Sequence, residues 1–295
     1  MTKSYIATPR RTTEILQAYN FSFKKSLGQN FIIDVNILKK IIEHAEINKE
    51  VGVIEVGPGI GSLTEQLALH ANKVVAFEID ERLLPILKDT LSAYDNITIV
   101  HADILKVNMK EVFAEHFADT ERIHLVANLP YYITTPILMH ILQTAPGIKQ
   151  MTVMLQKEVA ERMAAKPNTK EYGSLSIAVQ YYTETKVVMD VPKTVFIPQP
   201  NVTSSVLTLK RREQPLVQVD DEQLFFEVVQ ASFAHRRKTI RNNLLRHFSK
   251  SLDKEVILQS LKNAEIAESV RAEAITINQF ANLSNEIGKY VTENT

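Results

Sequence analysis

The chain contains no cysteine among its 295 residues, and it also lacks a long apolar run. The absence of cysteine excludes disulfide bonds, thiolate metal sites and a cysteine nucleophile, and it suits a reducing compartment. No stretch approaches the roughly 20 apolar residues of a transmembrane helix. The first 25 residues include no apolar segment long enough for a signal peptide. We therefore expect a cytoplasmic protein without a membrane partner.

Net charge is also absent, because 34 Lys and Arg residues balance 34 Asp and Glu residues. Taken alone, this balance argues against a nucleic-acid partner, but an average hides charges that are segregated along the chain. The eight histidines show no ligand spacing with acidic residues, so we expect no metal site. No coiled-coil heptad repeat is present, and we expect a monomer.

Short apolar segments alternate with amphipathic helical patterns from Val51 onward. This alternation predicts an α/β fold with a parallel, doubly wound sheet. We also expect edge strands, in an antiparallel hairpin, at 172–191 and 204–212. The strands predicted for the parallel part are 51–56, 73–80, 96–103, 124–131 and 150–156.

The pattern after Asp220 is helical throughout, and residues 213–219 read as a short linker. We therefore predict two domains. The first is a Rossmann-like α/β domain at 1–212, of which residues 1–25 form an N-terminal extension. The second is a small all-α C-terminal domain at 220–295.

Polar residues and glycines occupy the ends of four successive predicted strands. The sequence GPGIG follows the first of them, with glycines at Gly57 and Gly59, and it differs from the G-x-G-x-x-G sequence of dinucleotide binding. Glu78 ends the second, Asp103 the third and Asn128 the fourth. Each acid by itself can be a helix cap or a solvated turn. Because ligands of such sheets bind beyond the carboxyl ends of the strands, the four together predict a cofactor site.

The chemistry of these positions favours S-adenosylmethionine as the cofactor. A carboxylate at Glu78 can accept both ribose hydroxyls, and Asp103 can accept from an adenine amino group. The glycine loop lacks the Lys-Ser/Thr pair of a phosphate-binding G-K-S/T sequence. S-adenosylmethionine carries no phosphate, and its carboxylate can lie near backbone N–H groups of the loop.

The sequence NLPY at 128–131 suits an adenine amino group as the methyl acceptor. The side-chain oxygen of Asn128 and the carbonyl of Leu129 can accept hydrogen bonds from the two N–H groups of the adenine amino nitrogen. These bonds would draw the nitrogen towards tetrahedral geometry. Pro130 fixes the backbone, and Tyr131 can stack on the base. Phe196, which precedes two prolines in FIPQP, is a candidate for the other face of the base, although a phenylalanine in that position is usually a core residue.

Several longer segments carry a family resemblance. SLGQNFIID, VIEVGPGIGSLTEQLA, NLPYYITTPIL, MLQKEVAERMAAKP, YGSLS and FIPQPNVTSSV resemble the ribosomal RNA adenine dimethyltransferase family, and the C-terminal FAHRRKTIRNNL is similar to its small-subunit (16S rRNA, kasugamycin-sensitivity) type. The resemblance implies a Rossmann-like S-adenosylmethionine-dependent methyltransferase domain. It implies N6,N6-dimethylation of two adjacent adenosines in a hairpin loop near the 3′ end of 16S rRNA, during late assembly of the 30S subunit. The implied cofactor contacts are Asn30, Ile32, Gly57, Glu78, Asp103 and Asn128.

Charge is segregated in the way that an RNA partner requires. The segment 235–250, HRRKTIRNNLLRHFSK, carries six Arg and Lys residues and no acid, and a second cluster lies at 210–212. Such runs bind phosphate without reading sequence, although any one of them can also be a solvated helix face. The RNA-binding residues that we predict are Lys24, Lys25, Arg211, Arg212, Arg236, Arg237, Lys238 and Arg241.

Three alternative functions stay open at the level of the sequence. The macrolide-resistance branch methylates an adenosine of 23S rRNA with the same pocket, and the C-terminal domain is what favours 16S rRNA. A non-catalytic ribosome assembly factor would keep the fold, but the intact NLPY and the cofactor acids argue against lost catalysis. A small-molecule or DNA amino-methyltransferase is the third alternative, and DNA enzymes often have proline where this chain has Leu129.

Overall fold

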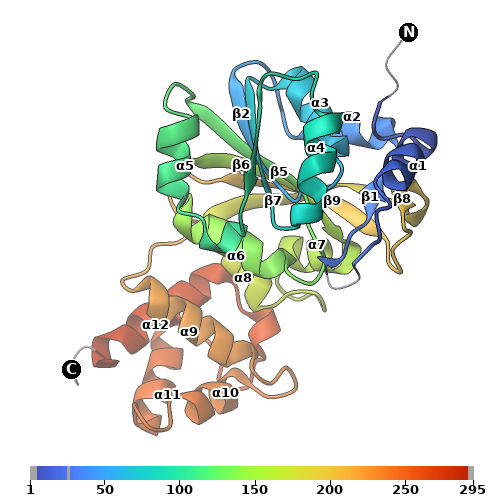
Figure 1. The fold of residues 1–295 in the computed structure, drawn as a ribbon. Coiled ribbons are helices and arrows are strands. Elements are labelled where there is room, and N and C mark those ends of the chain that lie inside the picture. The colour runs from blue at the N-terminus through green and yellow to red at the C-terminus, as the bar shows by residue number, and fades with distance from the viewer. Residues whose placement is uncertain (1–4, 25–26, 292–295) are drawn as a thin grey trace. The chain divides into compact units, whose positions relative to one another are not determined.

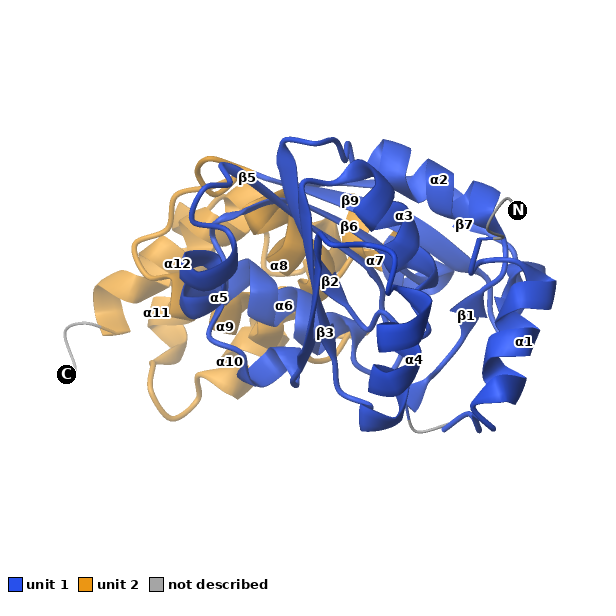
Figure 2. Ribbon diagram, turned by 45° about the horizontal axis from the view of Figure 1, so that its top comes forward, with its two compact units in different colours: residues 1–160, 184–211 blue, residues 161–183, 212–295 orange. Residues whose placement is uncertain are grey.

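The computed structural model describes residues 5–24 and 27–291, and the chain divides into two compact units (Figure 2). Unit 1 holds the predicted α/β fold, and unit 2 is helical. Unit 1 comprises residues 1–160 and 184–211, and unit 2 comprises residues 161–183 and 212–295.

A seven-stranded sheet forms the centre of unit 1, with the strand order β4-β3-β2-β5-β6-β9-β7 (Figure 1). Neighbours among β2 to β6 pair in parallel, as predicted, and β9 is antiparallel to β6. The direction of winding reverses between β2 and β5, which is where such sheets open a crevice for a ligand. The strands are β2 (Val51–Val56), β3 (Lys73–Glu78), β4 (Ile97–His101), β5 (Arg122–Asn128), β6 (Ile148–Gln156), β7 (Thr183–Val191) and β9 (Ser204–Arg211).

Helices alternate with these strands and bury their apolar faces. Leu38 and Ile41 of α2 and Leu67 of α3 share a core with Val53 and Val126 of the sheet. The helices that follow one another through this part of the chain are α1 (Pro9–Ala18), α2 (Val35–His44), α3 (Ser62–His70), α4 (Leu84–Thr90), α5 (Met109–His116), α6 (Thr134–Thr144) and α7 (Lys157–Ala164), with short 3-10 turns η2 (Glu81–Leu83), η3 (Ile104–Lys106) and η4 (Lys193–Val195).

A separate two-stranded ribbon joins the N-terminal region to a late segment of the chain. It pairs β1 (Phe31–Ile32) with β8 (Phe196–Ile197) in antiparallel fashion, so that Ile32 lies opposite Phe196. The ribbon therefore pairs the segment before α2 with the start of the proline-bearing loop VFIPQPNVTSS, which the sequence places at 195–205.

The prediction of strands throughout 172–191 is wrong in its first half. Helix α8 (Ser174–Tyr182) occupies that half, and only β7 is a strand. Aromatic and β-branched residues favour a strand locally, but Ile177 and Tyr181 are four residues apart and both are buried in the core of unit 2. The buried Tyr172 hydroxyl donates to the carbonyl of Ile275 at 3.0 Å. Residues 161–183, which the sequence pattern groups with the α/β domain, thus pack with the helices of unit 2.

Unit 2 is helical after Asp220, as predicted. Its core contains Phe225, Val228, Leu244 and Phe280. Within the described residues, no helix combines the length and the apolar character that crossing a membrane requires. Besides α8, the helices are α9 (Glu222–Phe233), α10 (Ile240–His247), α11 (Lys254–Asn263) and α12 (Ile277–Val291), with the short turn η5 (Ala272–Ala274).

Candidate active site

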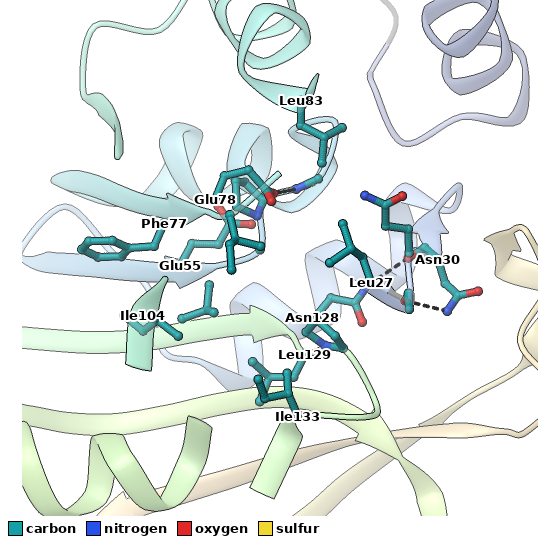
Figure 3. A pocket seen from close by; sticks show the side chains of 18 of the residues that line it. Leu27, Asn30, Glu55, Phe77, Glu78, Leu83, Ile104, Asn128, Leu129 and Ile133 are labelled. Carbon is teal, nitrogen blue, oxygen red and sulfur yellow. Dashed lines mark hydrogen bonds between the residues drawn. The ribbon is translucent and has the colours of Figure 1, made fainter. Parts of the chain in front are cut away.

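A cavity lies at the carboxyl ends of β2, β3, β4 and β5 and is bordered by the segment before α2 (Figure 3). The cavity and its solvent-open mouth together span about 1090 Å³. In the view of Figure 3, Glu55 and Glu78 lie on one side and Asn128 and Asn30 on the other. All the residues predicted to bind the cofactor line this cavity: Asn30, Ile32, Gly57, Gly59, Glu78, Asp103 and Asn128.

The glycine loop approaches the cavity through backbone that other residues adopt with strain. Gly59 has a φ of +62°, and a Cβ there would lie 2.9 Å from the Phe31 ring. The same tight approach brings the Gly59 N–H to Glu78, whose Oε2 accepts it at 3.3 Å. The loop therefore needs glycine both for its conformation and for its packing, and it fixes the acid at the end of β3.

The ionisable side chains that line the cavity are all acidic. Three carboxyl groups line it, those of Glu55, Glu78 and Asp103, and the described lining residues include no Lys, Arg or His. Glu78 is 4% exposed, and burial raises its pKa although the Asp80 and Gly59 N–H groups bond to it. An arrangement of this kind disfavours phosphate and favours a ligand with positive charge.

Glu55 is the acid that the sequence reasoning missed. It lies near the end of β2, is 1% exposed, and its Oε2 has no hydrogen-bond partner among the described residues. Burial raises the pKa of this carboxyl group to about 8. The neighbouring Ser62 Oγ, at the start of α3, is also buried without a partner. A single acid inside an apolar strand was the signal that could have found it.

The segment before α2 is tied to both sides of the cavity. The Asn30 carbonyl accepts from Nδ2 of Asn128 at 3.1 Å. Gln29 donates to Oδ2 of Asp80 at 2.8 Å, and Arg82 binds the same carboxylate through two nitrogens at 2.8 and 2.6 Å. These bonds lower the pKa of Asp80 to about 2, with Arg82 as the largest cause. The polar side chains between the segment before α2 and the strand ends are thus held in place by the protein itself, before any ligand binds.

The NLPY turn follows β5 directly and is held by its backbone. The Leu129 N–H donates to the carbonyl of Met154 at 3.0 Å, and the Pro130 carbonyl accepts from Thr134 Oγ1 at 2.9 Å. Because Nδ2 of Asn128 is engaged, the other end of the amide, Oδ1, is the end available as an acceptor. Leu129, Pro130 and Tyr131 all line the cavity with Asn128. The four residues predicted to hold the acceptor base therefore come together.

Phe196 does not join them. Its side chain is 1% exposed, packs in the core of the sheet and α2, and is not part of the cavity lining. Its backbone is adjacent to the site all the same, because it pairs with Ile32, which does line the cavity. Two exposed apolar residues at the cavity, Ile79 (52%) and Tyr132 (57%), were not singled out from the sequence.

The predicted RNA-binding residues of unit 1 differ in their environment. Lys24 is exposed, and Lys25 lies outside the described residues. Arg211 is half-buried and donates to the carbonyls of Ile148 and of Leu142, at 3.1 and 2.9 Å, close to the last turn of α6. Its guanidinium group is engaged by the protein's own backbone.

The predicted residues of unit 2 lie at or before the start of α10, with the exception of Arg212. Arg237 and Lys238 are exposed, and their side chains have no acidic partner among the described residues. Arg236 lies 3.7 Å from Glu273, and Arg241 lies 3.1 Å from Glu268. Arg212 donates to the carbonyl of Gln180 at 3.4 Å.

Metal ligands are not grouped anywhere in the described part of the chain, since no three His, Asp or Glu residues come together in a way that could hold an ion.

Comparison with known proteins gives a consistent result. A family model for ribosomal RNA adenine dimethylase matches residues 20–289. Ribosomal RNA small subunit methyltransferase A of Oceanobacillus iheyensis is 57% identical over 289 residues, covering 98% of each chain. The protein of the same name from a Geobacillus strain is 60% identical over 284 residues, covering 96% of this chain and 97% of its own.

Solved structures also resemble this one. A dimethyladenosine transferase from Plasmodium falciparum aligns with a TM-score of 0.73 and 26% identity over 88% of this chain and 98% of its own. The 23S rRNA methyltransferase ErmE aligns with a TM-score of 0.65 and 28% identity over 88% of this chain and 99% of its own.

Proposed function

The chain belongs to the ribosomal RNA adenine dimethylase family, and from this premise we propose that it is a 16S rRNA (adenine-N6,N6)-dimethyltransferase. The two adjacent adenosines of the 3′-terminal hairpin loop are the proposed targets, within the 30S subunit or its precursor during ribosome biogenesis. Relatives that are named for the small ribosomal subunit match this chain at 57% to 60% identity over nearly its whole length, which supports 16S over 23S rRNA. We expect the protein to act in the cytoplasm as a monomer.

The observation that carries the proposal is the acidic cavity at the strand ends. S-adenosylmethionine has a sulfonium and an ammonium group and no phosphate, so a wall with three carboxyl groups and no cation suits it. The buried Glu55 Oε2 and Ser62 Oγ lack partners within the described chain, and both line the cavity. A ligand with hydrogen-bond donors and acceptors at that end would satisfy them.

The roles of the other lining residues follow from their placement. Glu78 would accept the ribose hydroxyls and Asp103 the adenine amino group of the cofactor. The backbone of Gly57 and Gly59 would approach its carboxylate. Asn30 and Ile32 would close the site from the segment before α2.

The NLPY turn would then hold the target base, while the bound cofactor supplies an activated methyl group. Oδ1 of Asn128 and the Leu129 carbonyl would accept hydrogen bonds from the amino N–H groups, which concentrates the lone pair on nitrogen. Each transfer would leave the demethylated cofactor, a neutral thioether, and a methylated amine that is acidic enough to lose its proton to water without a strong general base. The ring of Tyr131 stacks on the base. A base inside structured RNA has to be unstacked to reach this position. The exposed Tyr132 and Ile79, which line the cavity, would contact the neighbouring nucleotides.

Phe196 stays in the proposal as a residue for the second face of the base. Its side chain is buried outside the cavity lining, so it has to move in order to contact the base. Ile32, its pairing partner in the β1–β8 ribbon, already lines the cavity. The aromatic clamp is therefore proposed to form when RNA binds.

RNA contacts are proposed for the exposed cations. Arg237 and Lys238 of unit 2 and Lys24 of unit 1 would meet phosphates, since they are exposed. Arg236 and Arg241 would do so by exchanging their acidic partners for phosphate. The carbonyl contacts of Arg211 favour a structural role for that residue instead.

The test is a methylation assay with the purified protein and radiolabelled S-adenosylmethionine. Undermethylated 30S subunits are the substrate, with 50S subunits and protein-free 23S rRNA in parallel, and the RNA is digested to nucleosides. Dimethyladenosine from 30S subunits alone is the expected result, and Asn128→Ala should abolish it. Label in 23S rRNA would assign the protein to the macrolide-resistance branch instead, and no label in any RNA would refute the catalytic proposal.

A further inference from the structure

The hydroxyl of Tyr131 is held by a residue from a distant part of the chain. It lies 2.6 Å from Oγ of Ser204, the first residue of β9, whose side chain is fully buried. The sheet explains the encounter. β5 pairs with β6 so that Asn128 lies opposite Met154, and β6 pairs with β9 so that Gln156 lies opposite Ser204.

We propose that Ser204 is a positioning residue for methyl transfer, because it fixes the Tyr131 ring in the orientation that stacks on the target adenine. The inference rests on the proposed function and adds to it a residue outside the cavity lining. It acts through Tyr131 and has no direct contact with the base.

In the absence of RNA, the hydrogen bond with Ser204 sets the orientation of the Tyr131 ring. The turn fixes the backbone, since the Pro130 carbonyl accepts both the Ile133 N–H and Thr134 Oγ1. The ring itself can still rotate about its side-chain torsions, and the anchored hydroxyl restricts that rotation. If the partner is removed, a half-buried hydroxyl is left unsatisfied and the ring shifts towards water. A small displacement of a group that positions the substrate lowers the rate of methyl transfer strongly, because the reacting atoms must be closely aligned.

The neighbouring serine supplies a matched control. Ser205 is also fully buried, but successive residues of a strand point to opposite faces of the sheet. Its hydroxyl donates to Oδ1 of Asp190 at 2.7 Å, and Asp190 in turn pairs with Lys157 at 2.6 Å. Ser205→Ala therefore removes the same chemical group from the same strand without touching Tyr131.

The experiment measures steady-state methylation of undermethylated 30S subunits by four single variants and one double variant of the full chain. We expect Ser204→Ala and Tyr131→Phe each to lower kcat/KM for the subunit roughly 3- to 10-fold, the range of one lost hydrogen bond. Affinity for S-adenosylmethionine, measured by calorimetry, should stay within twofold, and Ser205→Ala should match the wild type. The Asn128→Ala variant, which we expect to be inactive, gives the background methylation signal of the assay.

The double variant separates positioning from a general structural effect. In the Tyr131→Phe protein the bond is already absent, so adding Ser204→Ala should change kcat/KM by less than twofold. A Ser204→Ala protein with wild-type kinetics would overturn the inference. The inference would also be overturned if Ser204→Ala lowered kcat/KM as much in the Tyr131→Phe protein as in the wild type. The same holds if Ser205→Ala lowered kcat/KM as much as Ser204→Ala does.

Three outcomes decide between the proposed function and the inference. If Ser204→Ala fails to fold, Tyr131→Phe carries the test alone, and wild-type activity in that variant would overturn the inference. If the wild-type protein methylates no RNA, the proposed function fails and the inference falls with it. An active wild type beside an unaffected Ser204→Ala protein would refute the inference alone.

Discussion

A carboxyl group buried as deeply as that of Glu55 requires a compensating partner. Thr64 is the polar neighbour that lowers its pKa, but Thr64 Oγ1 and Glu55 Oε2 do not meet in hydrogen-bonding geometry among the described residues. Such a group stays protonated over much of the ordinary pH range, and its pKa of about 8 reflects this. A cationic ligand in the cavity would reverse the preference, because an adjacent positive charge favours the carboxylate. We therefore propose that Glu55 couples the affinity for the cofactor to pH.

This coupling predicts a pH dependence of stability in the absence of ligand. The folded pKa lies above the unfolded value of 4.5, so the folded state binds more protons between pH 4.5 and about 8, and stability falls as the pH rises through that range. At pH 7 the loss amounts to at most about 3 kcal/mol. Glu55→Gln should remove it. Urea unfolding at pH 5 and pH 8 checks this, and equal pH slopes for the two proteins would contradict it.

Phe196 offers a second prediction at the scale of a residue. If it closes on the target base, Phe196→Leu should lower kcat roughly 5- to 100-fold, the range expected for one aromatic stacking contact. The change keeps an apolar side chain in the core, so the melting temperature should fall only slightly. Phe225→Leu, at a fully buried site in unit 2, is the control for an equivalent core change. Wild-type kinetics in Phe196→Leu would assign Phe196 to the core alone.

At the scale of an element, Arg211 shows how a basic residue can serve the fold. It lies at the end of β9, and its guanidinium group donates to carbonyls near the last turn of α6, which helices leave without an internal partner. Cations are also favoured at that end of a helix. The contact joins a strand and a helix that are far apart in the sequence.

We therefore predict that Arg211→Ala lowers the free energy of unfolding by about 1 to 3 kcal/mol, because several buried carbonyls lose their donor. RNA affinity of the folded protein should change little. Lys210→Ala, which removes only an exposed ion pair with Glu46, is the control for stability, since such pairs contribute little to it. Chemical denaturation and a filter-binding assay measure the two quantities. An unchanged stability with weakened RNA binding would restore Arg211 to the RNA-binding group.

At the scale of the whole molecule, the zero net charge and the proposed RNA partner are compatible because the cations are not evenly distributed. The cavity wall is acidic, whereas the segment 235–250 contains no acid. One surface can thus attract a cationic cofactor while another attracts phosphate.

The corresponding prediction concerns salt. Arg237→Ala and Lys238→Ala should each weaken binding to the 30S subunit and reduce the slope of log affinity against log salt by about 1, without changing stability. Lys254→Ala, at an exposed position of α11, is the control. Titrations at several salt concentrations provide the measurement. Slopes that equal that of the wild type would remove these two residues from the interface.

Local sequence pattern was enough to predict the parallel sheet and to bring the proposed cofactor-binding residues to one edge of it. Strand ends of a parallel sheet meet at one edge, so Gly57, Glu78, Asp103 and Asn128 could be assigned to one cavity from their positions at the ends of apolar segments. The NLPY turn was predictable for the same reason. These inferences depend only on local pattern and on the geometry of the fold class.

The tertiary structure alone decided which side chains are buried and which are engaged. The burial of Phe196, the carbonyl contacts of Arg211 and the bond between Tyr131 and Ser204 all join segments that are distant along the chain. The helix at 174–182 depends likewise on a core that the later helices complete. Local pattern specifies an element and its apolar face, whereas the partner of a polar group is chosen by packing between elements, which no short window of sequence contains.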